Sequence, residues 1–407
     1  MKFLNTFFAL LLSVFCFAQK KYDVVITNIT VINTSTGKAE KGKNIYIKND
    51  QIEITSEVKK IAEPKVQING TGNYFMPALF DMHVHYPDQH AERFFKLQTA
   101  AGIATSRVMK TLPEATEQYK NYTDIPNLKL AYNFFGKETY PLDSIATIIS
   151  SLKRKGYHFI KIFGIKNEAF FDEVMAAALK NNITVCGHAL SNIAANKLLS
   201  SGYKSIEHVG YFDKAKTNEA LDSLVKIAVK NNVFVCPTLD WSMMVYHSIP
   251  QDSLKYRSGY AIGNKLYNID WDTTYNSFNK TAITQRKQYA DFMRNDVAKK
   301  IEILKKMRAN GLMIIAGSDA EEPYQTPGFS LVDELLLIKK AGYSNLELLK
   351  MVTENPMLYF GNKISDNKDF ILLSENPLTN ISNLSTVKYL IKGSKVTDTK
   401  KLIETIK

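Results

Sequence analysis

The chain has 407 residues with 52 lysines and arginines against 40 aspartates and glutamates, so its formal net charge is +12. The basic residues are interspersed with acidic ones and no RNA- or DNA-binding motif is visible, so the charge indicates a solvated surface rather than a nucleic-acid partner. The absence of a glycine-rich phosphate loop argues against a nucleotide or redox cofactor.

The first 18 residues are typical of a secretory signal peptide. A basic residue precedes the apolar stretch from Phe7 to Phe17, and small Ala18 is followed by polar residues, which predicts cleavage after Ala18. The apolar run is shorter than the ~20 residues that span a bilayer, so we expect no membrane anchor and a periplasmic or secreted mature protein. Cys16 follows bulky Phe15 instead of the small residue of a lipobox, which argues against lipidation.

Alternating strand-like and helical stretches predict an α/β fold. The mature length of roughly 390 residues exceeds one ~250-residue barrel, which leaves room for a smaller domain. Amphipathic stretches such as 171–181, 192–200 and 220–231 separate several of the strands and predict helices. The eight predicted strands are 78–85, 103–109, 128–134, 157–163, 183–188, 204–208, 232–238 and 312–318. We therefore expect a (β/α)8 TIM-like barrel over residues 76–361.

Both chain ends carry short strand-like runs outside this barrel. They comprise residues 22–27 and 44–48 near the N-terminus, and 370–373 and 387–391 near the C-terminus. These runs predict a small β-sandwich domain formed by residues 19–75 and 362–407.

The segment 240–310 is too long for an ordinary connection within a barrel. Its aromatic and basic residues suggest helices that cap the strand ends as a lid. The alternative is a peripheral insertion or an oligomer contact, so a homo-oligomer stays open.

The most informative motif is His83-Val84-His85, at the end of a long apolar run. Alternate residues of a strand point to the same side, so this spacing aims both imidazoles at one point. Taken alone, such a pair is more often two ordinary strand histidines than a pair of metal ligands.

Four further polar residues each close a short apolar run downstream: Lys161, His188, His208 and Asp319. A parallel barrel gathers its strand ends on one face, so all six side chains can meet there around a metal centre. In isolation Asp319 also fits a helix N-cap. Its position after the last predicted strand favours the metal site.

The run from Met76 to His85 resembles the PGLIDxHxH opening of the amidohydrolase superfamily. The likeness spans nearly the whole mature chain and is specific to the branch similar to imidazolonepropionases and metal-dependent Xaa-Pro dipeptidases. Further motifs in family order are Gly102–Arg107, Ile160–Ile162, Gly187–Ala189, Ser205–His208, Pro237–Leu239, Ala316–Ala320, Glu334-Leu335, Ala341-Gly342, Thr353–Pro356 and Asn376–Leu378.

The resemblance implies a ligand set and a mechanism. His83, His85 and Asp319 match the ligands of one Zn²⁺, and His188 and His208 those of a second. A lysine at the position of Lys161 is carboxylated in the family and bridges the two ions; an unmodified Lys161 would leave a single metal. The metal lowers the pKa of water to ~7 and supplies hydroxide that attacks the amide carbonyl. Asp319 is then the catalytic general base, which takes the proton and passes it to the departing amine.

The substrate is less well defined by the sequence. Arg107, Tyr140 and Tyr211 follow or end predicted strands and are candidates for binding a substrate carboxylate, although each also suits a structural role. Relatives commonly have the sequence Asp-x-Gly-Gly after the second strand, whereas this chain has Val108–Thr111 there. That part of the pocket therefore differs.

The preferred hypothesis is an exported amidohydrolase that cleaves C–N amide bonds in dipeptides, as a Xaa-Pro dipeptidase does. One alternative is a mononuclear hydrolase or deaminase that acts on a cyclic amide or imidazolone. Another is a non-catalytic barrel that only binds its ligand. The six filled ligand positions argue against this last alternative.

Overall fold

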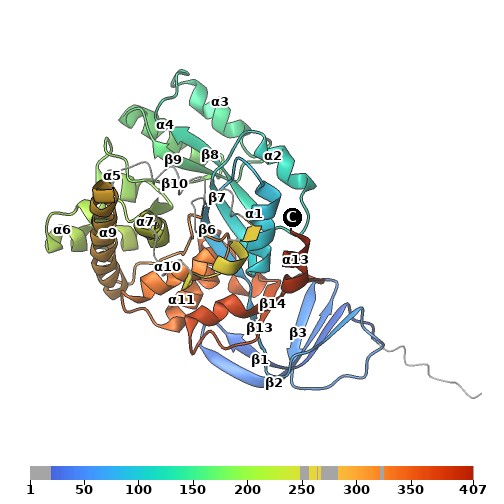
Figure 1. Cartoon of the computed structure of the whole chain (residues 1–407). Coiled ribbons are helices and arrows are strands. Elements are labelled where there is room, and N and C mark those ends of the chain that lie inside the picture. The colour runs from blue at the N-terminus through green and yellow to red at the C-terminus, as the bar shows by residue number, and fades with distance from the viewer. Residues whose placement is uncertain (1–19, 248–255, 264, 267–282, 321–324, 407) are drawn as a thin grey trace, which may run out of the picture.

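The computed structural model describes residues 20–247, 256–263, 265–266, 283–320 and 325–406, so the predicted signal peptide lies outside the described residues. Within them, a barrel of parallel strands stands beside a separate sheet built from both chain ends. Figure 1 shows this second sheet below the barrel, with the blue strands β1–β3 close to the red strands β13 and β14. The predicted α/β class and the pairing of the two chain ends are confirmed.

Within the described residues, seven parallel strands form the barrel wall, and each pairs with the next in chain order. Every residue of the first strand is buried, as expected for a strand covered on both faces. Both ends of each of these strands lie within two residues of the ends of a predicted strand. They are β6 (Leu79–His85), β7 (Ile103–Lys110), β8 (Asn127–Phe135), β9 (Phe159–Gly164), β10 (Thr184–Gly187), β11 (Ser205–Glu207) and β12 (Phe234–Cys236).

The eighth predicted strand, 312–318, is not a regular strand. Its segment nevertheless closes the barrel through two isolated parallel bridges, Ile314 with Val235 of β12 and Ala320 with Val84 of β6. The Met82 amide also donates a hydrogen bond to the Ala316 carbonyl oxygen, at 3.0 Å. The predicted count of eight strands is therefore corrected to seven strands and one irregular closing segment.

Helices surround the barrel, and the predicted helices 171–181, 192–200 and 220–231 correspond to α4, α5 and α6. The side chains of Asn167 and Thr217 cap α4 and α6 by accepting a hydrogen bond from the first turn. The helices are α1 (Ala91–Ala100), α2 (Ala115–Gln118), α3 (Ser144–Ser151), α4 (Glu168–Lys180), α5 (Ala195–Ser200), α6 (Asn218–Lys230), α7 (Leu239–His247), α9 (Ile283–Ala309), α10 (Ser330–Lys339), α11 (Asn345–Val352), α12 (Glu354–Tyr359) and α13 (Thr399–Thr405).

The segment 240–310 is described in part, chiefly as helices α7 and α9, which pack against each other. Helix α9 also contacts α6 on the outside of the barrel. None of the described helices is both long and apolar enough to cross a bilayer. The lid role of this segment and the domain boundaries stay predictions.

The second sheet has eight strands in the order β15-β14-β13-β5-β1-β2-β3, with β4 also beside β1. The described strands thus form one hydrogen-bonded sheet from both chain ends, where the β-sandwich domain was predicted. Register shifts in β1 around Ile29 let its first half pair with β4 and its second half with β5. The strands are β1 (Val24–Asn33), β2 (Lys38–Lys48), β3 (Gln51–Thr55), β4 (Val66–Asn69), β5 (Tyr74–Pro77), β13 (Asp369–Leu373), β14 (Val387–Lys392) and β15 (Lys395–Asp398).

Gly317 allows the closing segment to approach β6, because a Cβ added there would lie 2.3 Å from the backbone nitrogen of His83. We expect Gly317→Ala to lower the free energy of unfolding in urea by at least about 2 kcal/mol, since either strand must shift. Gly311→Ala is the control: its added Cβ meets no atom within 4 Å, and only its positive φ makes the change unfavourable. Equal losses in the two variants would contradict tight closure at Gly317.

Candidate metal centre and active site

The predicted ligands meet at the carboxyl ends of the barrel strands. The His83 ring lies 5.5 Å from the His85 ring and 5.0 Å from the His208 ring, measured between centroids. The His188 ring lies 4.9 Å from the His208 ring. Residues from β6 and from the ends of β10 and β11 thus form one imidazole cluster, as parallel barrel geometry predicts.

Asp319 joins this cluster from the closing segment. One of its oxygens lies 3.6 Å from His83 Nε2 and 3.4 Å from His85 Nε2. Ligand atoms about 2.0–2.1 Å from a tetrahedral zinc ion lie about 3.3 Å from one another. The spacing of these three side chains therefore fits a divalent cation between them.

The lowered pKa values of these imidazoles also suit the binding of a cation. Burial and, after it, the charge of nearby Lys161 together lower the pKa of His188 to about 3. Burial likewise holds the pKa of His83 and His208 well below the usual value. Neutral imidazoles present a lone pair, which a metal ligand needs. Among the described residues, His83 Nε2 is buried without a hydrogen-bond partner, as a ligand atom would be.

Lys161 lies deeper in the same site. Its side chain is fully buried, and its Nζ lies 4.6 Å from the ring centroid of Phe163. Within the described part of the chain, this Nζ has no hydrogen-bond partner. Burial lowers the pKa of Lys161, although the carboxylates of Glu207 and Asp319 oppose that shift. The amine is thus placed where a charged ammonium is disfavoured.

Glu207 is a functional residue that the sequence motif contains but that the ligand pattern did not single out. His83 Nδ1 lies 2.8 Å from a Glu207 carboxylate oxygen, so His83 donates from Nδ1 and turns Nε2 toward the metal position. Burial raises the pKa of Glu207, but the Arg107 guanidinium, Lys161 and a hydrogen bond from Ser205 together hold the pKa below its usual value. The carboxylate therefore stays ionised and fixes the His83 tautomer.

Thr238 fixes the tautomer of His208 in the same way. Its hydroxyl donates to the Pro237 carbonyl oxygen at 2.9 Å and accepts from His208 Nδ1 at 2.6 Å. The Nδ1 atom therefore carries the proton, and Nε2 is left to bind a metal. His208, Thr238 and Asp319 all have positive φ angles, near 60°, 50° and 51°, which is a strained backbone typical of functional sites.

Asp81, the aspartate of the Asp81–His85 motif, fastens the closing segment to β6. Its buried carboxylate accepts hydrogen bonds from the Ser318 amide at 2.9 Å and the Ser318 hydroxyl at 2.6 Å. The Asp319 amide in turn donates to the His83 carbonyl oxygen at 2.7 Å. These bonds set the position of Asp319 relative to both histidines of β6.

The comparisons with known proteins agree with this geometry. The model of the amidohydrolase family matches residues 164–396, which is more than half of the chain. The chain belongs to the amidohydrolase family. It is thus a hydrolase of carbon–nitrogen bonds, and His83, His85 and Asp319 form a candidate metal-binding group. No curated protein matches the sequence.

Solved structures share the fold of this amidohydrolase at low sequence identity. A Xaa-Pro dipeptidase with methionine bound in its active site is 17% identical, with a TM-score of 0.69, over 92% of this chain and 99% of its own. Bottromycin amidohydrolase is 15% identical, with a TM-score of 0.67, over 93% and 87%. The A. niger ochratoxinase is 15% identical, with a TM-score of 0.66, over 92% and 95%.

The contacts of Arg107 in this amidohydrolase do not fit the predicted substrate-binding role. Arg107 is fully buried, and its guanidinium donates to both Glu207 carboxylate oxygens at 3.0 and 2.9 Å. Its other N–H groups donate to Met82 O, Ser205 Oγ and Tyr359 OH. All five donors of Arg107 are used inside the barrel, so the interpretation as a carboxylate-binding residue is corrected to a positioning role.

The two tyrosine candidates differ. The Tyr211 hydroxyl accepts a hydrogen bond from the Leu190 amide at 2.9 Å and lies 2.7 and 2.9 Å from the Leu190 and Ile193 carbonyl oxygens, which share its one hydrogen, and so holds the loop that follows His188. This contact favours a structural role. Tyr140 is half-buried and packs on Phe170, at 6.0 Å between ring centroids. A substrate role for either tyrosine stays a prediction.

The insertion reaches this site at Trp241 of α7. The Trp241 ring lies 6.3 Å from the His208 ring, and Met293 of α9 packs against it. Asp240 accepts from Arg257 at 2.6 Å and from Gln325 at 2.9 Å. These contacts tie the described part of the insertion to the barrel mouth.

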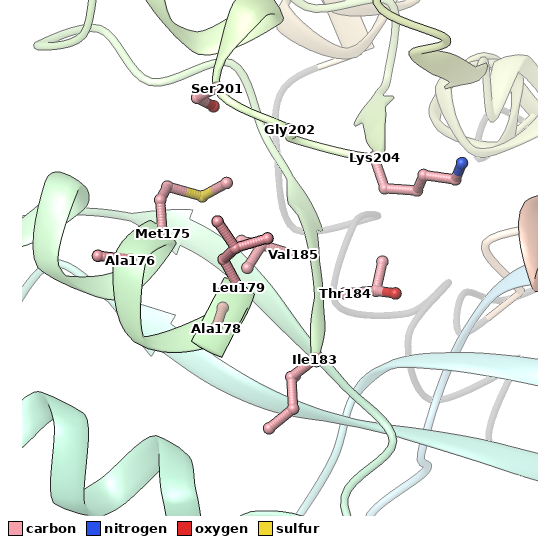
Figure 2. Close-up of a pocket in the computed structure, with 10 residues that line it drawn as sticks. All are labelled: Met175, Ala176, Ala178, Leu179, Ile183, Thr184, Val185, Ser201, Gly202 and Lys204. Carbon is pink, nitrogen blue, oxygen red and sulfur yellow. The ribbon is translucent and has the colours of Figure 1, made fainter. Parts of the chain in front are cut away.

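A separate pocket lies at the opposite end of the barrel. Residues of α4, the first residues of β10 and the turn 201–204 line it, with Met175 and Leu179 of α4 beside Val185 (Figure 2). Its lining is mainly apolar, and Lys204 is its one charged side chain. This pocket therefore lies away from the predicted ligands and takes no part in the active site.

We expect Arg107→Met to lower the free energy of unfolding by about 3–5 kcal/mol, because it leaves the buried Glu207 carboxylate without its cation. Zinc affinity should fall with it, and Arg107→Lys should recover part of both losses. The control is Arg308→Met, which removes a surface pair with Glu347 and should cost about 0–1 kcal/mol. Unchanged stability with only a raised KM would contradict the positioning role and support substrate binding by Arg107.

Thr238→Val keeps the shape of the side chain but removes the acceptor for His208 Nδ1. We expect zinc affinity, measured by calorimetry on the metal-free protein, to fall about 10-fold or more, since the imidazole loses its fixed tautomer. Thr99→Val is the matched control, because the Thr99 hydroxyl is buried without a partner among the described residues. Equal zinc affinity in both variants would refute the tautomer argument.

Proposed function

We propose that this amidohydrolase is an exported, zinc-dependent dipeptidase that hydrolyses the amide bond of small dipeptides, Xaa-Pro dipeptides among them. The observation that carries this proposal is the packing of Asp319 against His83 and His85, at 3.6 and 3.4 Å, within a cluster of four imidazoles. The arrangement provides ligands and a carboxylate base at one point of the barrel mouth.

A bound zinc ion would supply Lewis acidity, which polarises a carbonyl group and lowers the pKa of water to about 7. His83, His85 and Asp319 would hold one ion, and His188 and His208 a second. Glu207 and Thr238 keep His83 and His208 in the tautomer that binds. The apolar side of Phe163 keeps bulk water away from Lys161 and from the neighbouring ligands.

Asp319 serves as the general base in this proposal. Its carboxylate takes a proton from the attacking water and passes it to the amine that leaves, so the C–N bond breaks without releasing an unstable amide anion. The bonds from Asp81 to Ser318 and from the Asp319 amide to His83 hold the carboxylate in place.

Lys161 is proposed to carry a carboxylate on Nζ, formed from carbon dioxide with release of a proton. The support is its full burial, its lowered pKa and the lack of a hydrogen-bond partner for Nζ among the described residues. A neutral amine reacts with carbon dioxide, and the resulting anion can bridge two cations, whereas an ammonium would repel them. Two metals per chain and activation by bicarbonate are then expected.

Dipeptides are the proposed substrates because the comparison structures include a Xaa-Pro dipeptidase with methionine in its active site. Amides other than dipeptides are an alternative class, which the shared fold of a bottromycin amidohydrolase and an ochratoxinase supports. The predicted signal peptide supports a role in the periplasm or outside the cell, where peptide fragments arrive.

Asp319→Asn tests the mechanism directly. We expect the variant to retain zinc through its histidines but to lose at least about 100-fold in kcat, since general-base catalysis contributes 10²–10⁴. Asp172→Asn, which removes an exposed partner of Lys197, is the control and should keep full activity. Zinc content by atomic absorption separates metal loss from loss of the base, and full turnover in Asp319→Asn would overturn the assignment.

The substrate class is tested by amine release from a dipeptide library, Xaa-Pro members included, with the mature chain reconstituted with zinc and bicarbonate. Release from a defined set of dipeptides is the expected result. No release from any dipeptide, with zinc bound, would transfer the proposal to cyclic or aryl amides.

A further inference from the structure

Two phenylalanines at neighbouring strand ends form an aromatic surface at the barrel mouth. Phe135 ends β8, and Phe163 is the last side chain of β9 before Gly164. Their rings are stacked, with centroids 4.9 Å apart and an angle of 16° between planes. We call this pair the aromatic wall.

The backbone is built to bring these rings together. Each phenylalanine precedes a glycine, and the two strand ends approach closely at that point. A Cβ added to Gly164 would lie 2.9 Å from the Phe135 carbonyl oxygen, so only glycine fits there without a shift. The aromatic wall is therefore a fixed part of the barrel rim.

The aromatic wall borders the metal ligands on one side and solvent on the other. The Phe163 ring meets the His188 ring edge to face at 5.0 Å and the His85 ring at 6.4 Å. Phe135, by contrast, keeps 51% of its surface exposed. A large apolar side chain left in water beside a catalytic cluster is typical of a ligand-contacting surface.

A second aromatic side chain stands across the mouth. Trp241 follows β12, which is four strands from β8 around the barrel and thus belongs to the opposite wall. Its ring lies 6.3 Å from the His208 ring. An amide whose carbonyl group reaches the histidine cluster would therefore have apolar surface on both flanks.

We propose that the aromatic wall binds a bulky apolar side chain next to the scissile amide, so that the enzyme selects amides carrying aromatic or long aliphatic groups. This inference rests on the proposed function for its reaction and adds the substrate class. The stacked rings offer a flat face on which a phenyl or leucyl group can be buried, whereas glycine or serine would leave Phe135 in water.

The first test is turnover of a dipeptide panel that carries phenylalanine, leucine, serine or glycine at either position. We expect the apolar members to exceed the glycine and serine members about 10- to 200-fold in kcat/KM, a range typical of discrimination by apolar pockets. Phe135→Ala should reduce that preference at least about fivefold, and Phe135→Leu, which keeps an apolar surface, should retain most of it.

The matched control is Phe292→Ala, because Phe292 is also an exposed phenylalanine stacked on a neighbouring ring, that of Tyr289, but lies on α9. It should leave the preference unchanged. If dipeptides are cleaved and Phe135→Ala keeps the full preference, the aromatic wall is not the subsite, while the proposed dipeptidase activity stands.

A binding measurement separates the two proposals. Calorimetry would compare reduced-amide analogues of Phe-Gly, Gly-Phe and Gly-Gly, in which a CH2–NH group replaces the amide. Tighter binding of a phenylalanine analogue that is lost in Phe135→Ala, without cleavage of any dipeptide, would support the aromatic wall and reject dipeptides as substrates. Equal binding of all three analogues would overturn the inference.

Discussion

The buried contact of Glu207 with Arg107 and His83 is the interaction on which the barrel interior depends. It joins β11, β7 and β6 at one point, and none of the three side chains is accessible to solvent. Removing a carboxylate and a guanidinium from water costs several kcal/mol per ion, and the contacts of Arg107 Nη2 with both carboxylate oxygens, together with further hydrogen bonds, offset that cost. The same carboxylate orients a predicted metal ligand, so stability and metal binding share one group.

The closing segment shows why this barrel is irregular where its chemistry lies. A regular eighth strand would continue the ladder beside β6, whereas here Gly317 packs against the His83 backbone and Asp319 adopts a positive φ. The unfavourable backbone conformation is held by the Asp81 bonds to Ser318. Strain of this kind persists only where surrounding contacts over-determine it, and it places the Asp319 carboxylate between two imidazoles.

The site combines imidazoles, a fully buried amine and aromatic rings within a few ångströms of one another. Phe163 contacts both Lys161 and His188, so the same ring affects the proposed metal bridge and the proposed substrate surface. Electrostatic interactions are stronger where water is excluded, which suits attack on an unactivated amide. Trp241 extends the apolar surroundings to the other side of the mouth.

Sequence alone determined the class of fold and which residues gather at the candidate metal centre. Burial on both faces makes parallel strands read as continuous apolar runs, so seven of them could be located from hydrophobicity. The period of two in His83-Val84-His85 and the polar residues that close later runs pointed to one edge, because parallel strands end together. Each of these patterns involves residues close together in the sequence, so it can be recognised without the structure.

Only the tertiary structure decided what the remaining polar residues do. Arg107 suits substrate binding as well as an internal role until its five donors are seen to be occupied. Glu207 and Thr238 orient ligands from other strands, and the two Phe-Gly pairs meet only because β8 and β9 are neighbours. Such roles depend on contacts between residues far apart in the chain, and a pattern within one strand carries no information about them.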